Sequence, residues 1–84
     1  MTDLEFDILD ELYFVTPFEQ LRQTLGMDEL PLKQALEALI SKGWVKCFHV
    51  GSIEIVTTEM NLNDEYRHYH YLATKAGLFA HNSR

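Results

Sequence analysis

The sequence predicts a single α+β domain in which three helices precede an antiparallel β-ribbon and a short helix ends the chain. Apolar residues recur at helical spacing as far as Gly43, after which the composition becomes aromatic and β-branched, as in strands. The chain has 84 residues, of which 46% are hydrophobic and 24% charged, which is the size and balance of one small globular domain. With no repeat or linker in the sequence, we expect residues 1–84 to form that single domain.

The first helix is expected from Asp3 to Phe14, with a cap at Thr2 or Asp3. Two apolar rows run along it, one at Leu4, Ile8, Leu12 and Val15 and the other at Phe6, Leu9 and Tyr13. A surface helix usually buries one stripe, so two rows indicate that this helix is covered on both sides. The second cover is either a C-terminal segment of the same chain or a partner chain. In the latter case Phe6, Leu9 and Tyr13 form the interface.

Proline and glycine residues delimit the next two helices. Thr16 as N-cap and Pro17 at the first helical position predict a second helix, which ends at Gly26 because glycine tolerates a left-handed backbone. A third helix is expected to begin at Pro31 and to stop at Gly43. Its apolar face consists of Leu32, Ala35, Leu36 and Leu39.

Three strands and a final helix are expected after Gly43. Aromatic and β-branched residues, with period-two alternation in the later segments, predict strands over 44–50, 53–57 and 68–73. Gly51-Ser52 is a turn signal, and the polar segment 58–67 is expected to be a loop. Thr74 is expected to cap a short helix over 75–81, although Gly77 is unfavourable within a helix.

Two stretches of this pattern resemble the winged-helix version of the helix-turn-helix fold. Residues 36–45, LEALISKGWV, are similar to the end of a winged-helix recognition helix, where a leucine-rich turn runs into Gly, a large apolar residue and a β-branched residue. Residues 71–77, YLATKAG, are similar to the Tyr-x-Leu-Thr-x-x-Gly stretch of many bacterial winged-helix regulators, with Ala73 in place of the usual larger residue. The resemblance covers almost the whole chain. It implies a three-helix core, a two- to three-stranded antiparallel wing and a short C-terminal helix.

The resemblance also implies a DNA-binding transcriptional regulator that acts as a homodimer, with the third helix in the major groove. In that case Lys33, Gln34 and Ser41 would face the bases, and the phosphates would be held by Arg22, Lys42, Lys46 and Arg67. The charge of the chain opposes this function. Thirteen acids against seven Lys and Arg residues give a formal charge of −6, whereas DNA binding needs a basic surface. The alternative is an acidic winged-helix module that binds proteins or dimerises without binding DNA.

Other functional classes have little support in the sequence. A Gly-rich phosphate loop and a nucleophile motif are both missing, so we expect neither an enzyme nor a cofactor. His49, His68, His70 and Cys47 do not have the spacing of a known metal site. A single cysteine cannot form an internal disulfide, which favours the cytoplasm. Because no apolar stretch is long enough to span a membrane, we expect no membrane association.

Aromatic residues are frequent in the second half of the chain, at Trp44, Phe48, Tyr66, Tyr69, Tyr71 and Phe79. Stacking platforms for single-stranded nucleic acid use such residues together with basic neighbours. Here the neighbours are acidic or neutral. Core packing is therefore the favoured interpretation of these side chains.

Overall fold

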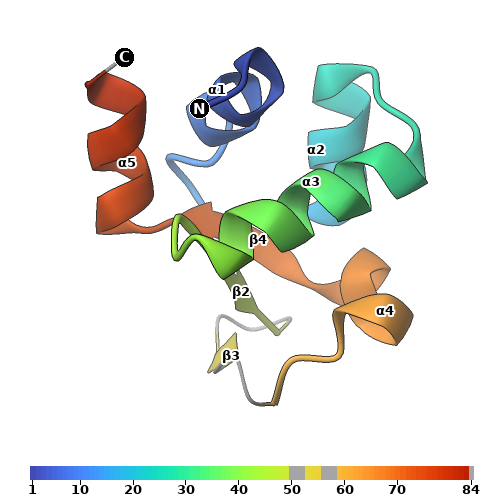
Figure 1. Cartoon of the computed structure of the whole chain (residues 1–84). Coiled ribbons are helices and arrows are strands. Elements are labelled where there is room, and N and C mark those ends of the chain that lie inside the picture. Colours follow the sequence, from blue (N-terminus) through green and yellow to red (C-terminus); the bar gives the residue numbers. More distant parts are fainter. Residues whose placement is uncertain (50–52, 56–58, 84) are drawn as a thin grey trace.

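Three helices and a four-stranded antiparallel sheet make up most of the computed structural model, which describes residues 1–49, 53–55 and 59–83 (Figure 1). The helices are α1 (Asp3–Asp10), α2 (Phe18–Leu25) and α3 (Glu29–Ser41). In the view of Figure 1, α1 and α2 lie above the sheet and α3 crosses in front of β4, while the C-terminal helix α5 (Lys75–Asn82) lies beside α1. The predicted α+β class is therefore confirmed.

Helix α1 begins as expected but is shorter than the sequence predicts. The Thr2 side chain accepts a hydrogen bond from the Glu5 backbone N–H, and the Glu5 carboxylate accepts one from the Thr2 backbone N–H, which together form a capping box. The helix ends at Asp10 rather than at Phe14. After Asp10 the last turn tightens, with the backbone N–H groups of Glu11 and Leu12 donating to the carbonyl groups of Ile8 and Leu9, and the Leu12 carbonyl accepts a hydrogen bond from the backbone N–H of Ala73.

A short strand, β1 (Thr16–Pro17), precedes α2 and was not expected from the sequence. It pairs antiparallel with β4 (His70–Ala73), which makes the sheet four-stranded rather than two- to three-stranded. Thr16 is therefore not the N-cap of α2. Its hydroxyl group donates to the Phe14 carbonyl, and Pro17 occupies the N-cap position without a side-chain hydrogen bond.

Glycines end α2 and α3 as predicted. Gly26 has φ 64° and Gly43 has φ 76°, both in the left-handed region where a Cβ atom is unfavourable. Helix α3 begins at Glu29, two residues before Pro31. Proline is tolerated there because the first-turn N–H groups of a helix have no intrahelical acceptor.

The sheet has the strand order β1-β4-β2-β3, where β2 is Val45–Phe48 and β3 is Glu54–Ile55. Every neighbouring pair is antiparallel, and Cys47 lies opposite both Ile55 and Tyr71. These three side chains are buried on one face, as expected from period-two alternation. The predicted turn at Gly51-Ser52, and the predicted strand residues at 50 and 56–57, lie outside the described residues.

The polar segment before β4 contains helix rather than an irregular loop. A short helix, α4 (Leu62–Glu65), is followed by a 3₁₀ turn, η2 (Tyr66–His68), so the last strand begins at His70 instead of His68. Tyr66 anchors the segment, because its ring packs edge-on against Phe18 at 5.0 Å and its carbonyl accepts a hydrogen bond from the Tyr71 hydroxyl group. One buried tyrosine in a polar segment gives no helical periodicity for the sequence to reveal.

Candidate functional site

The second apolar row of α1 packs against α5 of the same chain. The Phe6 ring stacks on His81 with centroids 4.2 Å apart, and Leu9 is fully buried. The Tyr13 hydroxyl group donates to Oδ1 of Asn82 at 3.0 Å. Of the two covers that the sequence left open, α5 provides the C-terminal segment of the same chain, which packs on Phe6 while Tyr13 remains 43% exposed.

His81 links α5 to α1 and to Tyr13 in the following loop through its two ring nitrogens. Its Nε2 atom lies 3.1 Å from Oδ1 of Asp10, and its Nδ1 atom lies 3.1 Å from the Tyr13 hydroxyl oxygen. The imidazole is buried between α1 and α5, where its contacts join segments about seventy residues apart in sequence. Sequence reasoning missed His81, because a single histidine near a chain end has no spacing signal. The contacts fix the position of α5 against α1.

Lys33, the base expected to face DNA from α3, is bound within the chain. Its Nζ atom lies 2.9 Å from Oδ1 of Asn63 in α4 and 3.5 Å from Oε1 of Glu37. The ammonium group also lies 5.7 Å from the centre of the Tyr66 ring, and the Lys33 side chain is only 17% exposed. Gln34, by contrast, is exposed on α3. The side chain best suited to a phosphate or a guanine therefore holds α4 against α3.

Two arginines expected to hold phosphates are each paired with a glutamate. The Arg22 Nη2 atom lies 2.6 Å from Oε1 of Glu19, and Arg67 makes a two-pronged contact with Glu29, at 2.8 Å from Nε and 3.0 Å from Nη2. Hydrogen bonds from these guanidinium groups hold the pKa values of Glu19 and Glu29 below the ordinary range. Both glutamates are therefore ionised at neutral pH and neutralise the arginines.

The two remaining lysines of the predicted set are also paired. Lys42 donates to Oε2 of Glu5, and its ammonium group lies 4.9 Å from the centre of the Trp44 ring. Lys46 lies 3.4 Å from Oε1 of Glu54 across the β2–β3 pair. Ser41 is exposed at the end of α3.

Almost every Lys and Arg side chain in the described part of the chain is therefore paired with a carboxylate. Of the seven Lys and Arg residues, Arg84 lies outside the described residues, and five of the other six form ion pairs. Lys75 is the one described Lys or Arg residue without such a pair. The structure thus does not combine the predicted phosphate-binding residues into a basic surface. The pairs of Arg22 with Glu19 and of Lys33 with Glu37 follow the i,i+3 and i,i+4 spacing of a helix, which sequence alone can indicate. The Arg67–Glu29 pair joins residues 38 positions apart, so the sequence gives no such indication.

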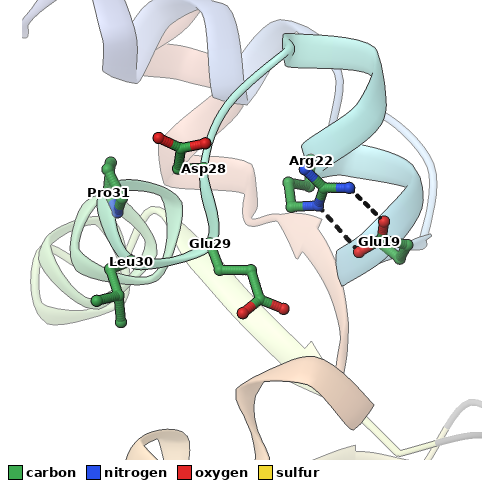
Figure 2. A pocket seen from close by; sticks show the side chains of 6 residues that line it. All are labelled: Glu19, Arg22, Asp28, Glu29, Leu30 and Pro31. Carbon is green, nitrogen blue, oxygen red and sulfur yellow. Dashed lines mark hydrogen bonds and ion pairs between the residues drawn. The ribbon is translucent and has the colours of Figure 1, made fainter.

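An open hollow of about 580 Å³ lies between α2 and the start of α3 (Figure 2). Figure 2 shows Arg22 turned toward Glu19, with Asp28 just before α3 and Glu29 at the start of that helix. Leu30 and Pro31 complete the lining. Glu19 and Glu29 are paired with Arg22 and Arg67, and Asp28 adds a negative charge to the lining, which disfavours phosphate in the hollow.

Cys47 has no reactive character in this fold. Its side chain is fully buried on β2, and burial raises the pKa of the thiol to about 12. The Sγ atom lies 3.7 Å from Sδ of Met60. Within residues 1–49, 53–55 and 59–83, no group of three or more His, Cys, Asp or Glu side chains is placed to hold a metal ion.

No protein-family model, curated protein or solved structure matches the chain. The described segments also contain no helix with the length and apolar character needed to cross a membrane.

Glu5 is expected to stabilise the fold in a pH-dependent way. Hydrogen bonds from Lys42 and from the Thr2 backbone hold the pKa of Glu5 below its ordinary value of 4.5. The ionised Glu5 side chain therefore adds fully to the free energy of unfolding above pH 4.5. This added stability is lost as the pH falls through the lower pKa that Glu5 has in the folded state. Glu5→Gln should reduce the free energy of unfolding by about 1–2 kcal/mol at pH 7.

Urea denaturation of the parent and Glu5→Gln from neutral pH to about pH 3 measures this difference. The gap between the two proteins should narrow below pH 4.5. Glu11→Gln, an exposed change in the same segment, should have little effect at any pH. A gap that stays constant down to acidic pH would contradict the assigned role of the Glu5 carboxylate.

Proposed function

We propose that the chain is a winged helix-turn-helix domain that acts by binding protein rather than DNA. The order of α1, α2 and α3 followed by antiparallel strands and a short C-terminal helix supports the winged-helix assignment. The two stretches that carry the resemblance also have matching local structure. Gly43 ends α3 directly before β2, and Thr74 caps α5 directly after β4, where its hydroxyl oxygen accepts a hydrogen bond from the Gly77 N–H.

One observation supports protein binding over DNA binding, namely that the predicted phosphate contacts are already neutralised. Exposed ion pairs contribute only about 0–1 kcal/mol each, so separating them is not costly in itself. The carboxylate of each pair nevertheless stays beside its base. Two like charges at about 4 Å repel by about 1 kcal/mol in water and about 4 kcal/mol near a protein surface. A phosphate that approaches Arg22 or Arg67 therefore meets Glu19 or Glu29 as well.

The segment between β3 and β4 further limits access to α3. Asn63 of α4 binds Lys33, and Arg67 of η2 binds Glu29 at the start of the helix. Two side chains of the predicted DNA-contacting set thus serve to dock this segment. The surface that results is acidic, and it fits a protein partner with basic groups better than it fits a polyanion.

A DNA-binding regulator remains the second candidate function. Gln34 and Ser41 are exposed on α3 and are side chains that can hydrogen-bond to base edges. Both candidates assign the same fold, and they differ in the affinity that they predict for duplex DNA.

Fluorescence anisotropy of a labelled mixed-sequence duplex, titrated at low and at moderate salt, tests the choice. We expect no salt-sensitive binding up to about 100 μM protein, which is the weak end of ordinary non-specific DNA affinity. Binding that weakens steeply with salt would overturn the proposal and favour the regulator. In that event Lys33→Glu should reduce the affinity, because Lys33 is the one base of the predicted base-reading set on α3.

A further inference from the structure

Three side chains at the junction of α1 and α5 form a continuous hydrogen-bonded chain that ends at the surface. The Asp10 carboxylate lies 3.1 Å from Nε2 of His81, and Nδ1 of the same imidazole lies 3.1 Å from the Tyr13 hydroxyl oxygen. His81 is 8% exposed, whereas Tyr13 is 43% exposed. A buried histidine therefore connects a carboxylate with a phenol that solvent can reach.

The contacts of His81 determine which of its nitrogens can accept a hydrogen bond. A carboxylate only accepts, so Asp10 requires a hydrogen on Nε2, which leaves a lone pair on Nδ1 of the neutral imidazole. The Tyr13 hydroxyl group and Oδ1 of Asn82 both lie 3.1 Å from Nδ1. Because the amide oxygen has no hydrogen to donate, Tyr13 is the available donor. Rotation about the phenol C–O bond moves the hydroxyl hydrogen from Asn82 to His81.

Packing holds the ring of His81 in this orientation. Phe6 of α1 stacks on the imidazole with centroids 4.2 Å apart, and the Tyr13 ring meets it edge-on at 5.6 Å. His81 is thus the packed ring of α5, while Phe79 is 72% exposed and not in the core as the sequence predicts. A base that is oriented by a third group and lies within hydrogen-bond reach of a hydroxyl group is the arrangement that activates protein nucleophiles.

We propose that Tyr13 is a nucleophile that accepts an acyl group from an activated ester. His81 is the catalytic base, because Nδ1 takes the phenol hydrogen as the Tyr13 oxygen attacks the ester carbonyl carbon. The bond from that carbon to the leaving oxygen breaks, the leaving oxygen takes the proton from Nδ1, and Tyr13 keeps the acyl group as an aryl ester. Asp10 is a positioning residue, since it acts through the imidazole.

The charge around Tyr13 favours an acyl donor over a phosphoryl donor. Residues 1–21 contain six acids and no Lys or Arg, and two of the acids, Asp10 and Glu11, lie within three positions of Tyr13. A phosphate ester brings negative charge to the reacting atom and is repelled there, whereas an ester carbonyl group is neutral. This inference goes beyond the proposed function and does not depend on it, because the site uses neither α3 nor a basic surface.

Reaction of the full chain with p-nitrophenyl acetate, followed by peptide mass spectrometry, tests the site. The parent should be acetylated at Tyr13 at about pH 7.5, where an unassisted phenol is almost fully protonated. His81→Gln should lower the rate of acetylation at Tyr13 by about a hundredfold or more, which is the usual gain from a positioned base. The other tyrosines are buried and should not react, namely Tyr66, Tyr69 and Tyr71. Thermal unfolding confirms that each variant folds.

Asp10→Asn tests the orientation of the base separately from the fold. An asparagine amide can donate to Nε2, which would place the imidazole hydrogen on Nδ1 and remove the acceptor for Tyr13. Because the Asp10 side chain is 58% exposed, the variant should fold, and its rate of acetylation should fall by about tenfold or more. Asp7→Asn, which makes the same charge change at an exposed position of α1, is the matched control and should react like the parent.

The pH dependence of the reaction separates a base from a merely structural histidine. At about pH 10 a phenol ionises without a base, so the parent, His81→Gln and Asp10→Asn should acetylate Tyr13 at similar rates. A deficit of the variants that persists at that pH would assign His81 to the fold alone and would overturn the proposal. A parent that is not acetylated at Tyr13 near neutral pH, or equal rates for the parent and His81→Gln there, would overturn it as well.

Discussion

Replacement of Phe18 by alanine is expected to reduce the free energy of unfolding by about 3–5 kcal/mol. Phe18 is 1% exposed at the start of α2, and its ring contacts those of Tyr66 in η2 and Tyr71 in β4. The change removes the side chain that joins three elements and leaves a cavity among them. A chain of this length has about 4–13 kcal/mol of stability in total, so the variant loses a large part of it. Urea denaturation followed by far-UV circular dichroism measures the loss.

Phe14→Ala is the matched control, because it deletes the same side chain from an exposed position and should change stability by no more than about 0.5 kcal/mol. Phe18→Leu keeps most of the apolar volume, so its loss of stability should lie between those of Phe18→Ala and Phe14→Ala. A loss below about 1 kcal/mol for Phe18→Ala would show that the contact of α2 with η2 is not part of the stable core.

Gly77→Ala is expected to destabilise the protein by about 2 kcal/mol or more, although alanine favours an isolated helix by about 1 kcal/mol relative to glycine. A Cβ atom at position 77 would lie 2.1 Å from the carbonyl oxygen of Trp44 and 3.0 Å from its carbonyl carbon. Both obstacles are backbone atoms, so the new methyl group must displace α5 from the residue just before β2. Thermal unfolding of the parent and the variant measures the effect.

Ala76→Gly provides the opposite comparison, because position 76 is exposed and only helix propensity acts there. It should cost about 1 kcal/mol. An increase in stability for Gly77→Ala would mean that α5 does not approach the Trp44 backbone as closely as the structure shows.

Local signals predicted most of the helices and strands. Gly26 and Gly43 end their helices in the left-handed conformation, and Thr2 and Thr74 accept the capping hydrogen bonds. Each of these features depends on residues a few positions apart. Gly77 was unfavourable for the helix in which it lies, and the close approach of α5 to Trp44 explains why glycine is needed there.

Long-range contacts account for the features that the sequence could not predict. Strand β1 is two residues long and exists because β4 pairs with it, which leaves no periodicity to detect. The candidate site shows the same limit. Sequence reasoning identified Arg67 as a base, but its partner Glu29 belongs to another element. Likewise, His81 has its role only because α5 folds back on α1.

The internal ion pairs, rather than total charge alone, are expected to keep the bases of this chain away from phosphate. Two variants with the same net charge separate these causes. The release variant removes four acids that form ion pairs, by the changes Glu19→Gln, Glu29→Gln, Glu37→Gln and Glu54→Gln. The control variant removes four exposed acids for which the structure assigns no ion pair, by the changes Asp7→Asn, Glu11→Gln, Glu59→Gln and Glu65→Gln. Each raises the formal charge from −6 by four, to −2.

Anisotropy of a labelled duplex at low salt, compared among the parent, the release variant and the control variant, is the most direct measurement. Release of the four bases should produce DNA binding that weakens with salt, while the parent and the control variant remain unbound. Salt-sensitive binding by the parent, or equal binding by the two variants, would contradict the role assigned to the ion pairs.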